Sequence, residues 1–372
     1  MELPETILQF GAGRFLRAFA DFFIHQANEH GQMVGRIVVV QSTGDERAGS
    51  LNRQNGRYHI VIRGLADGAV VDRVEESRSI SRALVASSQW SEILAVARSP
   101  DLRVILSNTT EVGYTLHPED IPSSDPPRSF PAKLLLVLKE RFDAGLPGVT
   151  IIPCELRENN AEVLRDLLLK QAGLWSLPDD FMKWLQGKCN WLNTLVDRIV
   201  TGPPKDHALL GQDTLLSTCE PYALWAIQQK EGRIPFLRHP AVTWTPDVQP
   251  YFLRKVRLLN GGHTALLIRS GLNRFKTVKE AVSDPDLGNW LERLFFEEIV
   301  PTLEGRVENP ALFARQVLER FRNPFLEHKL TDIASYYEEK VKVRLIPTLE
   351  EFKAKFQRTP PLLAEVLNTP LR

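Results

Sequence analysis

Residues 7–19 read ILQFGAGRFLRAF, and this stretch decides the fold of the N-terminal half. The apolar run Ile7–Phe10 is typical of a short buried strand, and it leads through Gly11-Ala12-Gly13 into a helical pattern over Arg14–Gln26. Glycines at such a turn let the backbone approach a pyrophosphate, and the helix start offers N–H donors. The pattern favours nucleotide binding, and the alternative is a tight strand-to-helix turn without a ligand.

Three further apolar runs in the first half are also typical of strands. Continuous Val, Ile and Leu without polar alternation is the pattern of parallel strands covered on both faces. A hairpin is predicted over Tyr58–Arg63 and Ala69–Val74, which flank the turn Asp67-Gly68. The sequence therefore predicts an α/β fold with an N-terminal doubly wound, Rossmann-type sheet. The three runs are Arg36–Val40, Val104–Leu106 and Val149–Ile152.

The pattern changes near Trp244–Pro250, where long amphipathic stretches replace the strands. We expect a Rossmann-type NAD-binding domain over residues 1–246 and a mainly α-helical substrate and catalytic domain over residues 247–372. The predicted helical stretches are Leu253–Leu267, Leu287–Ile299, Pro310–Phe321, Lys329–Lys342 and Glu350–Phe356.

Composition excludes several classes of function. Lys plus Arg and Asp plus Glu both total 46, so the net charge is zero and no basic excess favours nucleic-acid binding. The three cysteines stand far apart without zinc-site spacing, so no metal is predicted. No apolar run approaches the ~20 residues of a membrane span. Acids at Glu2 and Glu5 replace the basic start of a signal peptide, so we expect a cytoplasmic location. The oligomeric state stays open.

Two features leave the choice between NAD and NADP open. Leu16 stands where the third glycine of GxGxxG is usual, and Gln41 stands where an acid usually ends the second strand. An acid would bind the ribose hydroxyls and repel a 2′-phosphate. Gln41 can form hydrogen bonds to the hydroxyls but repels nothing, so charge does not settle the preference.

Residues 254–267 read RKVRLLNGGHTALL and carry the chemistry. An α-helix turns about 100° per residue, so Lys255, Asn260 and His263 fall within one arc of about 140°. A lysine can exchange the proton of an alcohol, and an amide can donate to the developing alkoxide. The alternative is an ordinary solvated face. Gly261-Gly262 costs about 1 kcal/mol per glycine in a helix, which predicts the close approach of a ligand or another backbone, or else a helix break.

Six segments, in this order, resemble the mannitol dehydrogenase family of polyol-specific long-chain dehydrogenases. The Lys-x4-Asn-x2-His spacing at 255, 260 and 263 is that family's active-site pattern. The resemblance implies a metal-independent, NAD(H)-dependent enzyme acting on CH–OH groups, with a sugar acid or polyol as its partner. The segments are Phe10–Phe19, Ser107–Gly113, Pro153–Asn160, Asn193–Gly202, Arg254–Thr264 and Arg320–His328.

The match is strongest to family members that reduce keto-uronates, which implies reduction of tagaturonate to altronate. Fructuronate reduction and oxidation of a polyol such as mannitol are the alternatives. A non-catalytic nucleotide-binding sensor on the same fold is a remote alternative.

The resemblance also implies roles for single residues. Lys255 is the expected general acid/base, and Asn260 with Asn160 is expected to hold the oxyanion. His263 and Asp197 are expected to contact substrate hydroxyls, and Lys340 falls where the family often has a substrate-contacting lysine. The expected cofactor-binding residues are Gly11, Ala12, Gly13, Phe15, Gln41, Thr109, Thr110 and Glu111.

Several of these residues have a simpler structural interpretation. Asp197-Arg198 could be an ion pair at a helix start, and Asn160 could cap a helix over residues 161–171, as could Asn159. Glu155 could be a solvated loop acid, and Cys154 is better explained as a small buried residue than as a nucleophile. The cation that would bind a substrate carboxylate is left open among Arg254, Arg257, Lys340 and Arg344.

Overall fold

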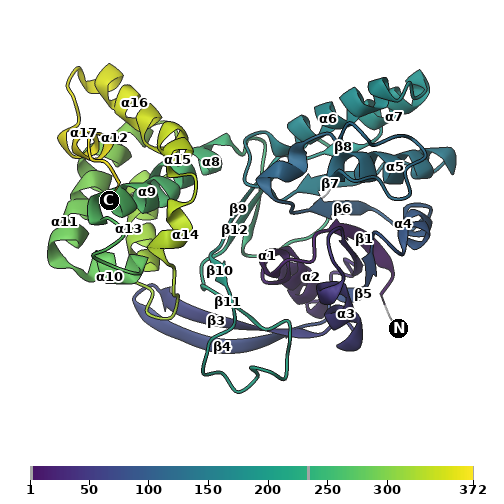
Figure 1. The fold of residues 1–372 in the computed structure, drawn as a ribbon, viewed down its shortest axis with the longest axis horizontal. Helices are drawn as coiled ribbons and strands as arrows, with labels where there is room; N and C mark the ends of the chain where they lie inside the picture. The colour runs from purple at the N-terminus through teal and green to yellow at the C-terminus, as the bar shows by residue number, and fades with distance from the viewer. Residues whose placement is uncertain (1–2, 233–234, 372) are drawn as a thin grey trace. The chain divides into compact units, whose positions relative to one another are not determined.

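The computed structural model describes residues 3–232 and 235–371, which form two compact units (Figure 1). The first contains the chain up to Val61 together with Val74–Thr218 and Ala223–Val248. The second contains the chain from Gln249 onward and two earlier segments, Ile62–Arg73 and Cys219–Tyr222. The predicted fold class is confirmed, because the first unit is built on a parallel sheet and the second is mainly helical. The predicted boundary between residues 246 and 247 stays a prediction.

A six-stranded sheet organises the described part of the first unit (Figure 1). Its order is β5-β2-β1-β6-β7-β8, and every neighbouring pair is parallel. Numbered along the chain, this is the Rossmann order 3-2-1-4-5-6. All four predicted strands are present as β1, β2, β6 and β7. The strands are β1 (Glu5–Phe10), β2 (Arg36–Gln41), β5 (Ile80–Val85), β6 (Val104–Ser107), β7 (Thr150–Pro153) and β8 (Asn190–Trp191).

Helices cover this sheet through a continuous apolar core. Leu8, Phe10, Val38 and Val40 of the strands are at most 2% exposed and share this core with α4 to α7. The helices of the first unit are α1 (Arg14–Arg17), α2 (Ala20–Glu29), α3 (Glu46–Arg53), α4 (Trp90–Ala97), the 3₁₀ turn η1 (Glu111–Tyr114), α5 (Phe130–Asp143), α6 (Asn160–Leu174) and α7 (Asp179–Gly187).

The helix predicted over Arg14–Gln26 is not continuous, and this expectation was wrong. It breaks between α1 and α2, where Phe19 adopts φ −134° and ψ −100°. The Arg198 guanidinium donates to the Ala18 carbonyl oxygen at 2.7 Å, so that carbonyl is satisfied outside a helix. Phe19 also packs against Phe23 and Trp225, with ring centroids 4.9 and 5.7 Å away. Tertiary contacts therefore override the helical pattern at this point.

Two smaller sheets complete the strands of the described residues. The predicted hairpin is confirmed, and Asp67 and Gly68 both have positive φ (51° and 76°), as a type I′ turn requires. One sheet has the order β10-β11-β3-β4 and the other β13-β12-β9. The strands are β3 (Tyr58–Ala66), β4 (Ala69–Ser77), β9 (Thr194–Asp197), β10 (Val200–Thr201), β11 (Ser217–Cys219), β12 (Leu224–Gln228) and β13 (Val242–Thr245).

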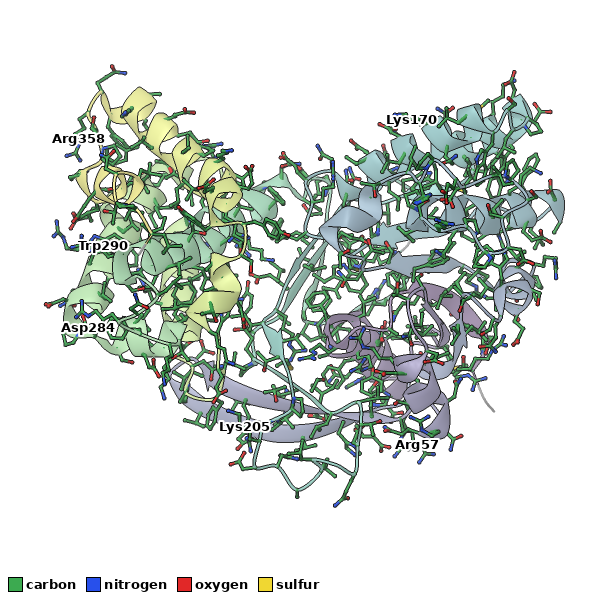
Figure 2. All side chains as sticks on the ribbon, in the orientation of Figure 1. Arg57, Lys170, Lys205, Asp284, Trp290 and Arg358 are labelled. Carbon is green, nitrogen blue, oxygen red and sulfur yellow. The ribbon has the colours of Figure 1, made fainter. Side chains whose placement is uncertain are left out.

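The second unit is mainly a cluster of helices, of which those beginning at Val278 and Pro285 have side-chain caps. Asp284 lies at the start of α11 (Figure 2). Its carboxylate accepts from the Leu287 N–H at 3.0 Å, and Pro285 occupies the first helical position. The elements are α8 (Gln249–Arg254), the π-helix η2 (Lys255–Asn260), α9 (Gly261–Ser270), α10 (Val278–Ser283), α11 (Pro285–Arg293), the π-helix η3 (Leu294–Ile299), α12 (Val300–Leu303), α13 (Pro310–Phe321), α14 (Leu330–Ala334), α15 (Tyr337–Arg344), α16 (Ile346–Phe356) and α17 (Pro361–Leu367).

The single helix predicted over Lys329–Lys342 was also wrong, because the chain forms α14 and α15 with a break between them. Tyr336 adopts a left-handed conformation with φ 53°, which ends helical geometry there. The Lys340 ammonium donates to the Ile333 carbonyl oxygen at 2.9 Å, so a helical side chain satisfies the end of α14.

Among the described residues, no helix combines the length and the apolar character needed to cross a membrane.

Candidate active site

The chemistry-bearing segment is helical, but its first part is a π-helix. Lys255–Asn260 forms η2, and α9 follows from Gly261. A π-helix has i→i+5 hydrogen bonds and often marks a functional site. The arc expected for an ideal α-helix is therefore wrong between Lys255 and Asn260, because a π-helix turns less per residue. Lys255 and His263 are 8% and 6% exposed, and Asn260 is half-buried.

His263 has a buried ring nitrogen that no group of the described residues satisfies. Its ring stacks on Phe321 at 4.2 Å between centroids and meets the edge of His328 at 4.6 Å. Its Nε2 atom has no hydrogen-bond partner in the described part of the chain. Burial is the largest cause that lowers the pKa of His263 well below its usual value. Four positive or protonatable neighbours lower it further, namely His328, Arg320, Arg344 and Lys255. The imidazole is therefore neutral. Such an orphan nitrogen is a ready partner for a substrate hydroxyl.

The two glycines of this segment are explained by close packing. A Cβ atom on Gly262 would lie 2.5 Å from Cζ of Phe295, and one on Gly261 would lie 3.5 Å from the Arg344 carbonyl oxygen. Gly261 has ordinary helical angles, φ −62° and ψ −46°. The helix therefore does not break here. The Arg344 carbonyl oxygen is at an ordinary van der Waals distance, and the tighter backbone contact at Gly261 is with the Val256 carbonyl oxygen, 3.3 Å from the added Cβ atom.

A buried ion pair missed in the sequence lies in the same unit. Nε and Nη2 of Arg320 donate to the two carboxylate oxygens of Glu220 at 2.9 and 2.8 Å. Both side chains are nearly inaccessible, at 3% and 1% exposure. The guanidinium also lies 4.2 Å from the centre of the Tyr222 ring. Arg320 belongs to the sixth resembling segment, but nothing in the sequence indicates a partner 100 residues earlier.

The four candidate cations have different surroundings. The Arg254 guanidinium lies over the rings of Tyr251 and Phe313, at 5.0 and 4.6 Å. Arg257 forms an ion pair with Glu351 at 3.0 Å. Lys340 donates to Ile333, as described above. Arg344 donates from Nη1 to Oγ1 of Thr264 at 3.3 Å.

In the first unit, the glycine turn has the geometry of a phosphate-binding loop. Gly11 has φ 128°, and a Cβ atom there would lie 2.8 Å from the Asn108 carbonyl oxygen. A Cβ atom on Gly13 would meet nothing within 4 Å, so the backbone there faces open space. Ala12 is 6% exposed, and Phe15 stacks on Phe19 at 4.9 Å. The turn therefore fits a bound dinucleotide, because only glycine is compatible with the first position and the third leaves room for a ligand.

Gln41 has a more local role than expected. It is 7% exposed, and its amide accepts from the Ala48 N–H at 2.7 Å and donates to the Thr43 carbonyl oxygen at 2.8 Å. The side chain thus organises the loop before α3. Asp45 and Glu46 line a surface pocket at the start of that helix. Arg53 lines the same pocket, which therefore carries charges of both signs.

Thr109 and Glu155 are joined at the carboxyl ends of β6 and β7. The Glu155 carboxylate accepts from the Thr109 N–H at 2.9 Å, from Ser107 Oγ at 3.1 Å and from the Tyr114 hydroxyl at 3.1 Å. Burial raises its pKa, and it is 7% exposed. The interpretation of Glu155 as a solvated loop acid is therefore wrong. Thr110 is exposed and precedes η1, which Glu111 begins; the Glu111 side chain lies outside the described residues.

Asn160 is fully buried at the start of α6. Its Oδ1 accepts from the Thr194 N–H at 3.0 Å, and its Nδ2 donates to the Pro153 and Glu155 carbonyl oxygens, both at 3.1 Å. The amide therefore links β7 to β9, and the N-cap position belongs to Asn159. Cys154, beside it, is a buried free thiol, as expected.

Asp197 ends strand β9 and is 1% exposed. The expected helix start at Asp197-Arg198 is wrong, because Asp197 ends a strand. Arg198 donates to the Ala18 carbonyl oxygen. Among the described residues, no three His, Cys, Asp or Glu side chains are grouped as a metal site would require.

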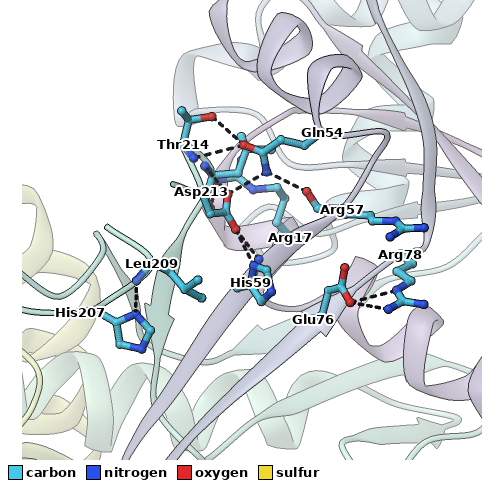
Figure 3. A network of polar contacts seen from close by, with 11 residues as sticks. Arg17, Gln54, Arg57, His59, Glu76, Arg78, His207, Leu209, Asp213 and Thr214 are labelled. Carbon is cyan, nitrogen blue, oxygen red and sulfur yellow. Dashed lines mark hydrogen bonds and ion pairs between the residues drawn. The ribbon is translucent and has the colours of Figure 1, made fainter. Parts of the chain in front are cut away.

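A buried polar network below the glycine turn was not predicted. Arg17 donates to the Ala12 carbonyl oxygen at 2.7 Å and to the Leu215 carbonyl oxygen at 3.2 Å. The Leu215 N–H donates to Asp213, which also accepts from the His59 N–H at 2.6 Å (Figure 3). The turn is thus connected through Arg17 to the loop that holds Asp213. Arg17, four residues after Gly13, was the only sequence signal for it.

Asp21 is completely buried next to this network. Its Oδ2 accepts from Nε2 of Gln9 at 3.2 Å, and the same nitrogen donates to the Gly11 carbonyl oxygen at 3.1 Å. Its Oδ1 has no partner in the described part of the chain. Burial raises the pKa of Asp21 to about 7.

We expect Asp21→Asn to stabilise the protein more at pH 8 than at pH 5. The folded-state pKa of about 7 lies above the unfolded value of about 3.9, so between these the folded chain holds a proton that the unfolded chain has lost. The free energy of unfolding therefore falls as pH rises through this window. An amide keeps the bond from Gln9 and removes the buried charge, which predicts a gain of about 1–3 kcal/mol at pH 8. Urea unfolding at both pH values measures it, and an equal gain at both would contradict the account.

A parallel sheet in the Rossmann order with an open glycine turn, and a helical unit with buried Lys255 and His263, define a dinucleotide-dependent oxidoreductase architecture. Two family models agree with this oxidoreductase architecture. The model "Mannitol dehydrogenase Rossmann domain" matches residues 5–236, and "Mannitol dehydrogenase C-terminal domain" matches residues 247–369. The chain belongs to the mannitol dehydrogenase family of oxidoreductases, and the predicted resemblance is confirmed.

Curated relatives match nearly the whole chain. An altronate oxidoreductase of Halalkalibacterium halodurans is 40% identical over 377 residues, which cover 97% of this chain and 73% of the relative. An altronate oxidoreductase of Yersinia enterocolitica is 40% identical over 379 residues, covering 98% of this chain and 78% of the relative.

Solved structures share the fold. Mannitol 2-dehydrogenase of Pseudomonas fluorescens, solved as a ternary complex with NAD and D-mannitol, superposes with a TM-score of 0.82 at 24% identity, over 98% of this chain and 78% of that one. A substrate-free D-sorbitol dehydrogenase gives a TM-score of 0.84 at 24% identity, over 98% and 79% of the two chains.

Proposed function

We propose that this protein reduces a keto-uronate with NADH, converting tagaturonate to altronate. The observation that carries the proposal is the identity of about 40% over almost the whole chain to altronate oxidoreductases. A neutral His263 with an unsatisfied nitrogen, close to Lys255, supports a site for a hydroxyl-rich substrate. Fructuronate reduction and oxidation of a mannitol-type polyol remain the alternatives.

The cofactor fits the residues of the first unit. Gly11, Ala12 and Gly13 would hold the pyrophosphate, because the turn is open at Gly13 and Arg17 fixes the Ala12 carbonyl. Phe15, Gln41, Thr109, Thr110 and Glu111 are proposed as further cofactor-binding residues. When bound, NAD(H) supplies the hydride that reduces the carbonyl carbon.

Residues of the second unit would manage the substrate oxygen. Lys255 would hold a proton and transfer it to this oxygen as the carbonyl becomes an alcohol, and Asn260 would donate a hydrogen bond to the same oxygen. His263 would bind a neighbouring hydroxyl through Nε2. Lys255 and Asn260 are the first and last residues of the π-helix. A π-helix has wider turns than an α-helix, so the backbone around these two donors is widened.

Three further residues are proposed with a narrower basis. Asn160 would help to hold the oxyanion only by exchanging one of its internal hydrogen bonds. Asp197 would contact substrate hydroxyls from the end of β9, and Lys340 would do so from α15.

We also propose a cytoplasmic location and no nucleic-acid or membrane partner. The three cysteines are buried free thiols, as is usual in a reducing compartment, and the net charge is zero.

A substrate panel tests the proposed function. Purified protein with NADH should reduce tagaturonate with a higher kcat/KM than fructuronate or fructose. Preference for fructuronate would assign the first alternative, and equal or better reduction of fructose would contradict the keto-uronate assignment.

We predict a modest preference for NADH over NADPH. Gln41 repels no 2′-phosphate, and the pocket at α3 is lined by Arg53 as well as by Asp45 and Glu46, so the preference for NADH is expected from the family. Titration with both reduced cofactors, followed by fluorescence, measures the two Kd values. NADPH bound at least tenfold more tightly would show that the cofactor assignment is wrong.

A further inference from the structure

Glu155 is a buried carboxylate to which the proposed function assigns no task. It follows β7 and belongs to the resembling segment Pro153–Asn160. The residue is 7% exposed, and burial raises the pKa of its carboxyl group. Burial of a charge is unfavourable unless polar groups compensate it, so the partners of this carboxylate indicate what it does.

Four donors surround the Glu155 carboxylate, and all of them come from the end of β6 and the segment after it. Oε1 accepts from the Thr109 N–H at 2.9 Å and from the Thr109 hydroxyl at 3.2 Å. Oε2 accepts from the hydroxyl groups of Ser107 and Tyr114, each at 3.1 Å. A carboxylate is an acceptor only, so this set of donors suits it. Glu155 therefore ties the segment from Ser107 to Tyr114 to the end of β7.

The segment that Glu155 holds is also connected to Asn160. A Cβ atom on Gly113 would lie 2.6 Å from Cβ of Thr109, so the turn η1 closes directly onto Thr109. The Tyr114 hydroxyl lies 3.3 Å from the Asn160 carbonyl oxygen. Nδ2 of Asn160 in turn donates to the Glu155 carbonyl oxygen at 3.1 Å. Glu155 is thus a common partner of Thr109, a proposed cofactor contact, and of Asn160.

These contacts lie at the edge of the sheet where a dinucleotide is expected. Along the sheet, the chain order reverses between β1 and β6 (Figure 1). Ligands of such folds occupy the crevice at the carboxyl ends of the strands at this point. The glycine turn after β1 suits the pyrophosphate, and the adenosine ribose belongs at the end of the second strand, here β2. The half of the sheet with β6 and β7 therefore suits the nicotinamide end.

The glycine turn is held by contacts that do not involve the Glu155 carboxylate. It packs against Asn108, whose carbonyl oxygen would lie 2.8 Å from a Cβ atom on Gly11. The Asn108 N–H donates to the Phe10 carbonyl oxygen at 3.0 Å, and its Nδ2 donates to the Cys154 carbonyl oxygen at 2.7 Å. Loss of the carboxylate should therefore loosen the segment after Asn108 and leave the glycine turn in place.

We propose that Glu155 is a positioning residue for the nicotinamide half of NAD(H), because its carboxylate fixes Thr109 and Tyr114 before the cofactor binds; this inference rests on the proposed function. A binding segment that is already ordered strengthens affinity, since the cost of ordering it is not met on binding. Glu155 acts through this segment and is not an acid or base of the reaction.

Glu155→Met tests the proposal by binding, with NADH and ADP as the two ligands. Methionine has a similar length but offers the Thr109 N–H no acceptor, so this buried donor loses its partner. Kd for NADH, followed by fluorescence, should increase about 10–100-fold. ADP contains the adenosine and the pyrophosphate but no nicotinamide. Its Kd, measured by calorimetry, should change less than about threefold.

Glu155→Gln should restore most of the affinity for NADH. Its Oε1 can still accept from the Thr109 N–H, and its amide nitrogen can donate to the Ser107 hydroxyl oxygen. The Tyr114 hydroxyl can donate to the Asn160 carbonyl oxygen, which lies 3.3 Å away. Kd for NADH should therefore stay within about fivefold of wild type.

Glu298→Met is the matched control, because it removes another buried carboxylate that accepts from backbone N–H groups. Glu298 is 2% exposed and accepts from the Leu362 and Leu363 N–H groups at 2.8 and 2.7 Å, within the second unit. The variant should have a lower melting temperature, as Glu155→Met should, but its Kd for NADH should equal that of wild type.

If Glu155→Met does not fold, Tyr114→Phe replaces it. This variant removes one of the four donors and the contact with the Asn160 carbonyl oxygen, and it keeps the aromatic ring. Kd for NADH should increase about threefold or more, and Kd for ADP should not change.

The outcomes separate the inference from the proposed function. Wild-type protein that binds no NADH would contradict the cofactor assignment and the inference together. Wild-type protein that binds NADH, with a Glu155→Met variant of unchanged Kd, would overturn the inference alone. Equal weakening of NADH and ADP would also overturn it, because Glu155 would then support the whole sheet edge. A Glu155→Gln variant as weak as Glu155→Met would contradict positioning through these hydrogen bonds.

Discussion

Lys255→Arg is expected to lower kcat by about 10²–10⁴-fold, nearly as much as Lys255→Ala. A lysine can deliver a proton to the substrate oxygen and recover it, whereas a guanidinium does not give up its proton near neutral pH. The position is 8% exposed, so bulk water has little access to replace the missing group. Steady-state kinetics with tagaturonate and NADH measure the loss.

NADH binding serves as the control for this variant. The glycine turn and Arg17 belong to the first unit and are unchanged, so Kd for NADH should stay within about twofold of wild type. If Lys255→Arg kept more than about a tenth of the wild-type kcat, proton transfer would not be its role. Lys255 would then be an electrostatic clamp, and the acid/base would have to be sought at His263.

Glu220→Gln is expected to destabilise the second unit by about 3–5 kcal/mol. The substitution leaves the Arg320 guanidinium buried without its carboxylate, in a place where both side chains are at most 3% exposed. The cost comes from the uncompensated charge more than from the lost hydrogen bonds. Thermal unfolding should show a melting temperature lower by roughly 6–20 °C.

Glu339→Gln is the matched control for this substitution. It makes the same chemical change in an ion pair whose two side chains are 62% and 70% exposed, so stability should change by less than about 1 kcal/mol. A double variant, Glu220→Met with Arg320→Met, should recover part of the loss because it removes both buried charges. A Glu220→Gln protein as stable as wild type would show that the pair is not buried as described.

The strands that could be predicted are those with uninterrupted apolar runs. The central residues of β1, β2, β6 and β7 are buried on both faces, so they are mostly Val, Ile or Leu, with the buried Gln9 as an exception in β1. β5 contains Ser81 and Arg82, and β8 has only two residues, so neither has a pattern of its own. Their pairing depends on the strands already in place, which a local pattern does not report.

The residue types of the candidate site could be predicted from the sequence, but their arrangement in space could not. Lys255, Asn260 and His263 were identified from their helical spacing and from the resemblance, whereas the π-helix that carries the first two has no signature in that spacing. Glu155 illustrates the same limit, because a loop acid becomes buried only when strands far apart in sequence place Ser107 and Tyr114 against it. Ion pairs such as Glu220 with Arg320 bridge 100 residues and leave no local signal.

The fate of a labelled hydride tests the central claim most directly. Tagaturonate is incubated with the protein and NADH that carries deuterium at both C4 positions, and the product is analysed by mass spectrometry and NMR. The account predicts altronate with one deuterium, on the carbon that bears the new hydroxyl group, formed in equal amount to the NADH consumed. NADH consumption without deuterated altronate, or no consumption with tagaturonate while another keto-sugar reacts, would contradict it.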